Sequence, residues 1–181
     1  MFRFGLILAV AVLVLDQISK WWILGPMAFS PAGCREIHLG CGFVELTPIF
    51  DLRMVWNEGV SFGLLSANSD FGRWALVLLQ GGIAAFFLYW MRTAARPLTA
   101  TALGLVIGGA LGNVVDRIRF GAVVDFLDFT GLGFPWVFNV ADAAINVGAG
   151  LLLLDFLLNS EKKSGTETKP EGAPQNGPDQ A

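Results

Sequence analysis

The sequence predicts an all-α polytopic membrane protein with four transmembrane helices, both termini in the cytoplasm and a small extracytosolic β element. Hydrophobic residues make up 54% of the 181 residues and charged residues only 15%, whereas soluble domains carry about 25% charged residues. The mean hydropathy is +0.60. Four apolar segments reach roughly the 18 residues that can cross the hydrocarbon core of a bilayer. We therefore expect one membrane domain over residues 1–160.

The first predicted span covers residues 4–24. A basic residue followed by an apolar run is also typical of a cleaved signal peptide. Polar residues interrupt this run, however, and Trp21 and Trp22 follow at the expected membrane interface, so we predict an uncleaved helix. Asp16 and Lys20 are four residues apart and share one helix face, where they can form an ion pair.

A long polar loop follows over residues 25–70. Within it, residues 43–46 and 49–56 show partial alternation with aromatic and β-branched side chains, which predicts two short strands. Asn57-Glu58-Gly59 is typical of a turn. The loop therefore supplies the predicted β element.

The second and third spans are predicted at residues 74–91 and 98–115. The second span contains one polar interior residue, Gln80, which we interpret as a contact between helices. Glycine recurs every fourth residue in the third span and forms a flat stripe that lets another helix approach closely. The stripe consists of Gly104, Gly108 and Gly112.

The fourth span is predicted at residues 136–158. Asn139, Asp142 and Asn146 fall on one face of it, and polar residues on a membrane helix point toward protein or water. Residues 161–181 are rich in Lys, Glu, Pro, Gly and Gln, so this tail should be disordered in the cytoplasm.

Short basic segments set the predicted orientation, because the positive-inside bias acts best on short connections. The segments at one end contain Arg3, Arg92, Arg96, Lys162 and Lys163. The 25–70 loop is then extracytosolic. Its two cysteines, Cys34 and Cys41, have six residues between them, and two interpretations stay open: a disulfide or two free thiols.

Polar residues converge on the extracytosolic end of the predicted bundle. The pattern Asn-x-x-Asp occurs as Asn113/Asp116 at the end of the third span and as Asn139/Asp142 in the fourth. These spans are antiparallel, so both patterns should lie at the same depth. The alternative function, a small proton-coupled transporter or channel, would carry polar groups through the whole membrane depth. The sequence instead favours chemistry at one face.

The residue types in the sequence exclude several kinds of catalytic and binding site. The only histidine lies in the first loop, and no Ser or Cys has a neighbouring base, so a nucleophilic triad is not supported. Zinc-ligand spacings such as H-E-x-x-H are absent, and no basic patch with interleaved aromatic residues suggests nucleic acid. A pair of carboxylates remains possible as the catalytic group. A close pair shares one proton, so that one member activates water while the other polarises a carbonyl group.

Asp142 is the strongest candidate for such a pair, because it lies on the polar face of a membrane helix. Its partner stays open among Asp116, Asp125 and Asp128. Asp116 is adjacent to Arg117, and an ion-paired carboxylate is a poor proton sharer. Asp125 lies in an apolar, strand-like run that could return its carboxylate to the fourth span. Spacing favours Asp125 over Asp128 only weakly.

Five motifs follow one another along the four spans. They are D-Q-I-S-K at 16–20, W-N-E-G-V-S-F-G at 56–63, G-G-A-L-G-N-V-V-D-R at 108–117, V-V-D-F at 123–126 and F-N-V-A-D-A-A-I at 138–145. In this order they resemble the motifs of lipoprotein signal peptidase, or signal peptidase II, a bacterial aspartyl peptidase family. The resemblance extends from the first span to the fourth and leaves out the tail.

The resemblance implies a multi-pass aspartic endopeptidase of the bacterial plasma (inner) membrane, with its active site at the extracytosolic face. It would remove the signal peptide from diacylglyceryl-modified prolipoproteins by cutting before the lipid-modified cysteine. It implies no metal or organic cofactor, inhibition by globomycin, and contacts with membrane lipid but not nucleic acid; we expect a monomer. The family's catalytic pair corresponds to Asp125 and Asp142. Supporting or substrate-binding positions correspond to Asp16, Lys20, Asn57, Gly59, Asn113, Asp116, Arg117, Asn139 and Ala141.

Overall fold

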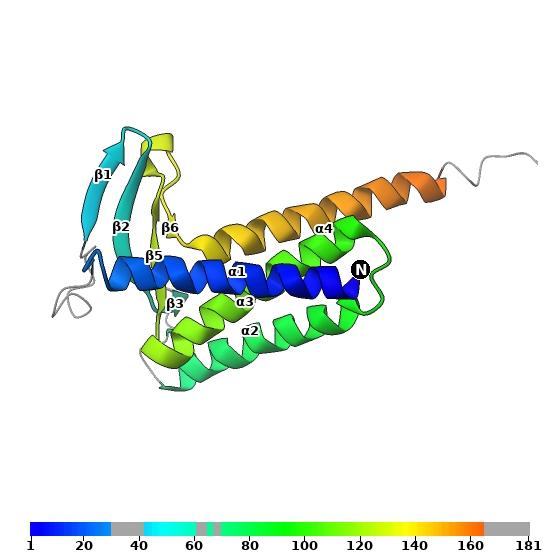
Figure 1. Ribbon diagram of the computed structural model, residues 1–181, viewed down its shortest axis with the longest axis horizontal. Helices are drawn as coiled ribbons and strands as arrows, with labels where there is room; N and C mark the ends of the chain where they lie inside the picture. Colours follow the sequence, from blue (N-terminus) through cyan, green and yellow to red (C-terminus); the bar gives the residue numbers. More distant parts are fainter. Residues whose placement is uncertain (30–41, 61–64, 67–69, 165–181) are drawn as a thin grey trace, which may run out of the picture.

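Four long helices and a small antiparallel sheet make up the computed structural model, which describes residues 1–29, 42–60, 65–66 and 70–164. The helices are α1 (Phe2–Leu24), α2 (Asp70–Met91), α3 (Pro97–Phe120) and α4 (Val140–Ser164). In the described part of the chain, these four are long and apolar enough to cross a membrane. The sheet covers one end of the bundle, and the N-terminus and the last turns of α4 lie at the other (Figure 1).

The predicted helix boundaries need corrections: α1, α2 and α3 begin two, four and one residues before their predicted starts. The third helix continues beyond Val115 to Phe120, where Gly121 ends it with a left-handed φ of 75°. The fourth begins at Val140 and not at Trp136, because Val137–Phe138 forms strand β6. It also extends beyond the predicted end to Ser164. The rest of the predicted tail, and the Cys34–Cys41 question, lie outside the described residues.

Helix α3 is the centre of the bundle and packs against α1, α2 and α4. The predicted glycine stripe explains how closely α1 approaches. A Cβ atom on Gly108 would lie 2.5 Å from the Ala9 carbonyl oxygen, and one on Gly104 would lie 2.7 Å from the Gly5 carbonyl oxygen. Gly109 plays the same part toward α4, where a Cβ would meet the Ala141 carbonyl oxygen. The prediction that the stripe is a packing surface is confirmed.

We expect Gly108→Ala to destabilise the bundle by about 1–3 kcal/mol, the usual cost of forcing an extra carbon into a packed interior. The contact atoms belong to the α1 backbone and to Val12 Cβ, so they cannot turn away. Thermal unfolding in detergent measures the effect. Gly81→Ala is the matched control, because a Cβ there meets nothing within 4 Å. An unchanged unfolding midpoint for Gly108→Ala would show that the helices separate freely.

The main sheet has the strand order β1-β2-β5-β6 and is antiparallel. Its strands are β1 (Phe43–Thr47), β2 (Phe50–Asn57), β5 (Val123–Asp128) and β6 (Val137–Phe138). A second pair joins β3 (Gly59–Val60) to β4 (Leu65–Ser66), and a 3-10 turn covers Thr130–Leu132. The two strands predicted in the first loop are confirmed as β1 and β2. The segment after α3 supplies the inner strand β5.

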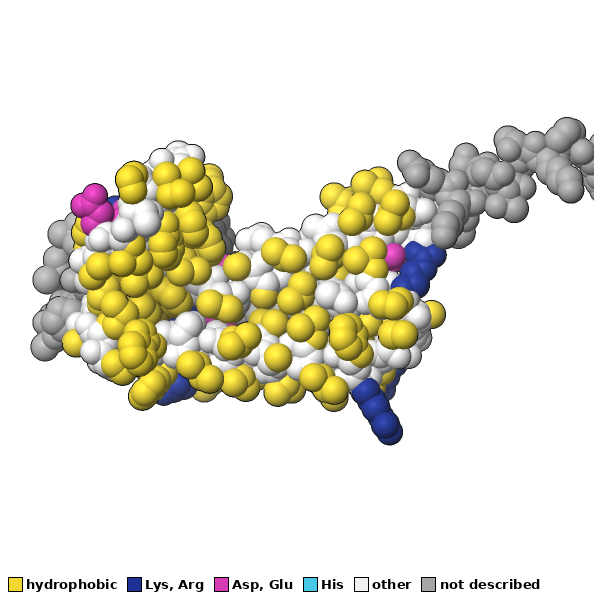
Figure 2. Space-filling model, turned by 45° about the horizontal axis from the view of Figure 1, so that its top comes forward, with side chains coloured by type: hydrophobic (Ala, Val, Ile, Leu, Met, Phe, Trp, Pro, Cys, Tyr) yellow, Lys and Arg dark blue, Asp and Glu magenta, His cyan; other side chains and the backbone are white. Residues whose placement is uncertain are grey.

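Strand β5 separates the apolar core of the sheet from the polar end of the bundle. Side chains alternate between the faces of a strand, and Val124 and Phe126 pack in a core cluster with Ile23 of α1 and Met54 of β2. Asp125 therefore faces the other way, toward the helices. Figure 2 shows hydrophobic side chains spread over the visible face of the helical body, with Lys and Arg near its ends.

Candidate active site

The Asp125 carboxylate is almost completely buried, at 1% exposure. Asn139 Nδ2 donates to its Oδ1 at 2.7 Å, and Asn57 Nδ2 donates to its Oδ2 at 2.9 Å. Asn57 lies opposite Val123 in the sheet, so it is the diagonal neighbour of Asp125 on the same face. Both oxygens are therefore fixed by side-chain amides from two different elements.

Asp142 stands in the first turn of α4 and closes a reciprocal cap with Asn139. The Asp142 amide donates to Asn139 Oδ1 at 2.8 Å, and the Asn139 amide lies 3.3 Å from Asp142 Oδ2. Such a capping box satisfies backbone donors at a helix start and fixes both side chains. The spacing of Asn139 and Asp142 therefore has a local cause in addition to any chemical one.

Two asparagines connect the carboxylates. Asn113 Nδ2 donates to Asp142 Oδ1 at 2.8 Å, and Asn113 Oδ1 accepts from Asn139 Nδ2 at 3.2 Å. The same side-chain Nδ2 group of Asn139 also donates to Asp125 Oδ1. Asp125 and Asp142 thus belong to one hydrogen-bonded unit built from β5, α3 and the start of α4.

A buried ion cluster supports this unit from α1. Lys20 Nζ lies 2.9 Å from Asp16 Oδ2 and 2.7 Å from Asp116 Oδ2, and it donates to Asn113 Oδ1 at 3.3 Å. The predicted pair of Asp16 and Lys20 is confirmed and gains Asp116 as a third member. Since Lys20 points at Asn113 Oδ1, it orients that amide so that its N–H faces Asp142.

The ion partner predicted for Asp116 is wrong. Asp116 pairs with Lys20 and not with Arg117, because α3 continues through both residues and adjacent side chains on a helix do not face each other. Arg117 Nη1 instead donates to Gln80 Oε1 of α2 at 2.9 Å. The Arg117 Nε atom is buried and has no hydrogen-bond partner among the described residues.

Two backbone amides also hold the side chains of the site in place. The Ala141 amide donates to Asp16 Oδ1 at 3.0 Å, which ties α4 to α1 next to Asp142. Gly59, with φ of 107°, turns its amide toward Asn57 Oδ1 at 3.0 Å. A positive φ is easiest for glycine. This turn leaves the side-chain Nδ2 group of Asn57 free to donate to Asp125.

Asp128 lies outside the hydrogen-bonded unit. Its Oδ2 is 2.8 Å from Arg53 Nε of β2, and its Oδ1 accepts from the Thr130 amide at 2.9 Å. It stands three residues after Asp125 on the same strand. The odd spacing places it on the other face, where its ion pair with Arg53 joins β5 to β2.

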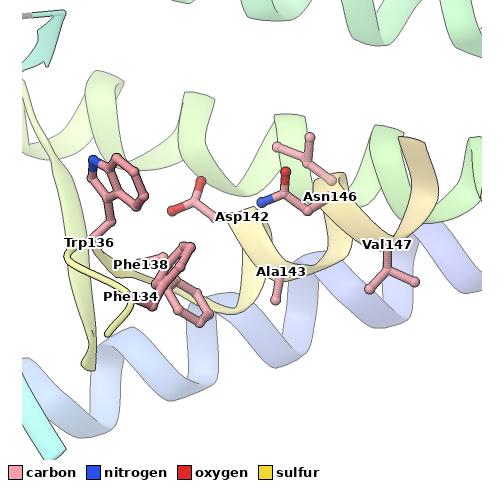
Figure 3. A pocket seen from close by; sticks show the side chains of 8 residues that line it. Phe134, Trp136, Phe138, Asp142, Ala143, Asn146 and Val147 are labelled. Carbon is pink, nitrogen blue, oxygen red and sulfur yellow. The ribbon is translucent and has the colours of Figure 1, made fainter. Parts of the chain in front are cut away.

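A cavity of about 560 Å³ opens beside Asp142. Its apolar lining comes from the segment before α4, with Phe134, Trp136 and Phe138, and from α4 itself. Figure 3 shows the Asp142 carboxylate between this aromatic group and the next turn of α4, which carries Asn146. An apolar cavity with a few fixed polar groups is typical of a binding site.

Burial and charge make Asp125 hold its proton. Removal from water, and then the negative charge of Asp142, raise the pKa of Asp125, whereas the side-chain amides of Asn57 and Asn139 and the charge of Lys20 lower it; the balance leaves the pKa at about 7. A carboxyl group of this kind carries a proton near neutral pH. The site therefore combines one proton-bearing carboxyl with a second carboxylate at a cavity.

Three further polar residues lie outside the predicted set of site residues. Gln17 Nε2 donates to Asp116 Oδ1 at 2.9 Å, and Gln80 binds Arg117, which confirms the predicted contact between helices. Asn146 lines the cavity. Their signal was present in the sequence, since a polar side chain in an apolar span needs a partner, but which partner depends on how the helices pack.

Fold and site together define a class: a four-helix membrane protein whose buried carboxylates meet at the sheet-covered end of the bundle. The family model of signal peptidase (SPase) II matches residues 8–158. The lipoprotein signal peptidase of Caulobacter vibrioides is 47% identical over 163 residues, covering 90% of this chain and 91% of that protein. That of Sphingopyxis alaskensis is 41% identical over 170 residues and covers 93% of each. The chain belongs to the signal peptidase II family.

Solved structures agree with this assignment. A bacterial membrane enzyme determined by the in meso method at 2.3 Å resolution has a TM-score of 0.72 and 25% identity, covering 94% of this chain and 95% of that one. Another, at 1.9 Å, has a TM-score of 0.69 and 28% identity, covering 86% of this chain and 93% of that one. The bundle with its sheet is thus a known membrane-enzyme fold.

Proposed function

We propose that this protein is an intramembrane aspartic endopeptidase that removes signal peptides from diacylglyceryl-modified prolipoproteins, cutting before the lipid-modified cysteine. The observation that carries the proposal is the hydrogen-bonded unit of Asp125 and Asp142 beside an apolar cavity. Membership in the signal peptidase II family supports the substrate class.

The environments of the two carboxyl groups support different roles for them. Asp125 is buried and bears the shared proton, so it hydrogen-bonds the scissile carbonyl oxygen and donates that proton to it as water adds and the carbonyl carbon becomes tetrahedral. Asp142 faces the cavity and takes a proton from the attacking water. Collapse of the intermediate breaks the C–N bond; the new amine receives a proton from Asp142, and the carboxyl product forms as Asp125 recovers its own.

The site is proposed to face the extracytosolic side of the bacterial inner membrane, with both termini in the cytoplasm and the protein acting as a monomer. The start of α1 and the connection from α2 to α3 lie at the end of the bundle away from the sheet (Figure 1). These short segments carry Arg3, Arg92 and Arg96, and the positive-inside bias operates on such segments. A lipid-modified cysteine near the outer leaflet surface would then meet the carboxylates at their own depth.

Polar groups of the described helices do not favour the transporter alternative. The Lys20 cluster lies at the sheet end, and the pair of Arg96 and Asp155 lies at the other. Between them, the central helix α3 has no ionisable residue from Thr99 to Gly112. A continuous path for ions would need such groups or a broken helix at mid-depth.

The test is cleavage of a synthetic diacylglyceryl-modified prolipoprotein by the purified full-length protein in lipid–detergent micelles, with the products identified by mass spectrometry. We expect one cut, before the modified cysteine, and inhibition by globomycin. Cleavage of the unmodified precursor at the same rate, or no cleavage of the modified one, would contradict the proposed substrate.

The pH dependence of cleavage should reflect Asp125. With its pKa at about 7, Asp125 loses the required proton above neutral pH, so kcat should fall on the alkaline side. Asn57 donates to the ionised form and lowers this pKa. In Asn57→Ala, Asp125 keeps its proton to higher pH, and the alkaline limb should therefore move upward, with kcat/KM about tenfold lower for the lost hydrogen bond.

Steady-state rates from pH 5 to 10 measure this change in the alkaline limb. Glu45→Gln is the control, because Glu45 is exposed on strand β1 and should leave the limb in place. An alkaline limb that stays in place, with an acid limb that moves upward instead, would mean that Asp125 acts in its ionised form.

A further inference from the structure

The cavity beside Asp142 contains a second polar group from α4 with no assigned role. Asn146 lies four residues after Asp142, so one helical turn separates them and they share a face. Figure 3 shows both side chains on the cavity side of the helix. The rest of the lining is apolar and consists of Phe134, Trp136, Phe138, Ala143, Ile145 and Val147.

The two polar groups differ in their partners. Asp142 accepts from Asn113 and from the Asn139 amide. Within the described residues, the Asn146 side chain makes no recorded hydrogen bond, and it is exposed on a membrane-spanning helix. An amide that faces an apolar environment unpaired is costly. A partner from outside the chain would remove that cost.

The chemistry of the cavity limits this partner. A carboxamide offers both donors and an acceptor, which match the C=O and N–H of a peptide group. The aromatic and aliphatic lining suits apolar side chains and not a charged ligand. An apolar peptide segment, bound through its backbone, has both properties.

We propose that Asn146 hydrogen-bonds the backbone of the signal peptide, one or two residues before the cleaved bond; this rests on the proposed function. The distance follows from geometry. Four helical residues rise about 6 Å from Asp142, and an extended peptide advances about 3.3 Å per residue. The direction follows because α4 runs away from the sheet (Figure 1). Asn146 comes four residues after Asp142 on this helix, so it lies deeper, on the side where the apolar signal segment remains.

Asn146→Leu tests the contact, since leucine has a similar size and cannot hydrogen-bond. With a diacylglyceryl-modified peptide substrate, we expect KM to rise about three- to tenfold, the effect of one hydrogen bond, with kcat unchanged, because the contact is the same in the bound and transition states. The thermal unfolding midpoint should not fall, since Asn146 has no partner in the described part of the fold. Val147→Ala, in the same cavity lining, is the control for lost apolar contact.

Substrates in which one backbone amide is replaced by an ester show which peptide group forms the hydrogen bond with Asn146. At the first or second position before the cleaved bond, the ester should slow the wild type as much as Asn146→Leu slows the amide substrate, and should not slow Asn146→Leu further. An ester at the third position should slow both proteins equally. Equal ester effects in both proteins at all positions would refute a bond that Asn146 accepts from a peptide N–H. An unchanged KM in Asn146→Leu would refute the Asn146 contact while wild-type cleavage upholds the proposed function. A wild type that cleaves no modified peptide would refute both.

Discussion

The Asp142→Asn protein is expected to fold, to insert into membranes and to process no lipid-modified prolipoprotein. Asparagine keeps one of the two oxygens, which accept from Asn113 Nδ2 and from the Asn139 backbone amide. The cap of α4 survives because its shorter bond, from the residue 142 backbone amide to Asn139 Oδ1, does not involve the changed side chain. It cannot take a proton from water. Loss of a catalytic group of this kind costs about 10⁴-fold or more in kcat. The measurement is product formation over hours with the purified variant.

Asp125→Asn should be equally inactive, because an amide cannot transfer the shared proton to the scissile carbonyl oxygen. Asp128→Asn is the matched control on the same strand, since its carboxylate serves Arg53 and the Thr130 amide instead. It should retain most of the wild-type rate. Normal processing by Asp125→Asn or Asp142→Asn would refute the pair, and an inactive but stably folded Asp128→Asn would reopen the choice of partner.

Asp142 was predictable because its signal is local. A carboxylate on the polar face of an apolar helix needs no knowledge of distant elements, and the Asn-x-x-Asp spacing is itself the capping box. Asp125 was different. Its chemical neighbours, Asn57 and Asn139, are 68 and 14 residues away in sequence, so residue spacing left it open and the family motif selected it.

The errors of prediction arose where pairing between distant residues overrides local pattern. Residues 136–138 are apolar enough to continue a membrane helix, but Val137 pairs with Asp128 and Phe138 with Leu127 of β5, and helix formation starts only after Asn139. The partner of Asp116 was assigned from sequence adjacency, whereas the helix turns Arg117 away and brings Lys20 from α1. Neither the pairing of β6 with β5 nor that of Asp116 with Lys20 can be recognised from a short stretch of sequence.

Lys20→Met should be the most destabilising single change at the site. Lys20 is 2% exposed, and Asp16 and Asp116 are both fully buried against it. Removing one partner from a buried ionic group leaves uncompensated charge and costs about 3–5 kcal/mol. We expect a clear fall of the thermal unfolding midpoint in detergent, with loss of cleavage following loss of folded protein.

Arg96→Met is the matched control, because its ion pair with Asp155 is half exposed and lies at the other end of the bundle. Exposed pairs contribute about 0–1 kcal/mol. Adding Asp16→Asn and Asp116→Asn to Lys20→Met should restore much of the stability, because no buried charge is then left unpaired. Activity should recover less, since the orienting bond from Lys20 to Asn113 stays absent. A Lys20→Met protein as stable as wild type would mean that the two carboxylates are held neutral, and the cluster would then support the site by hydrogen bonds alone.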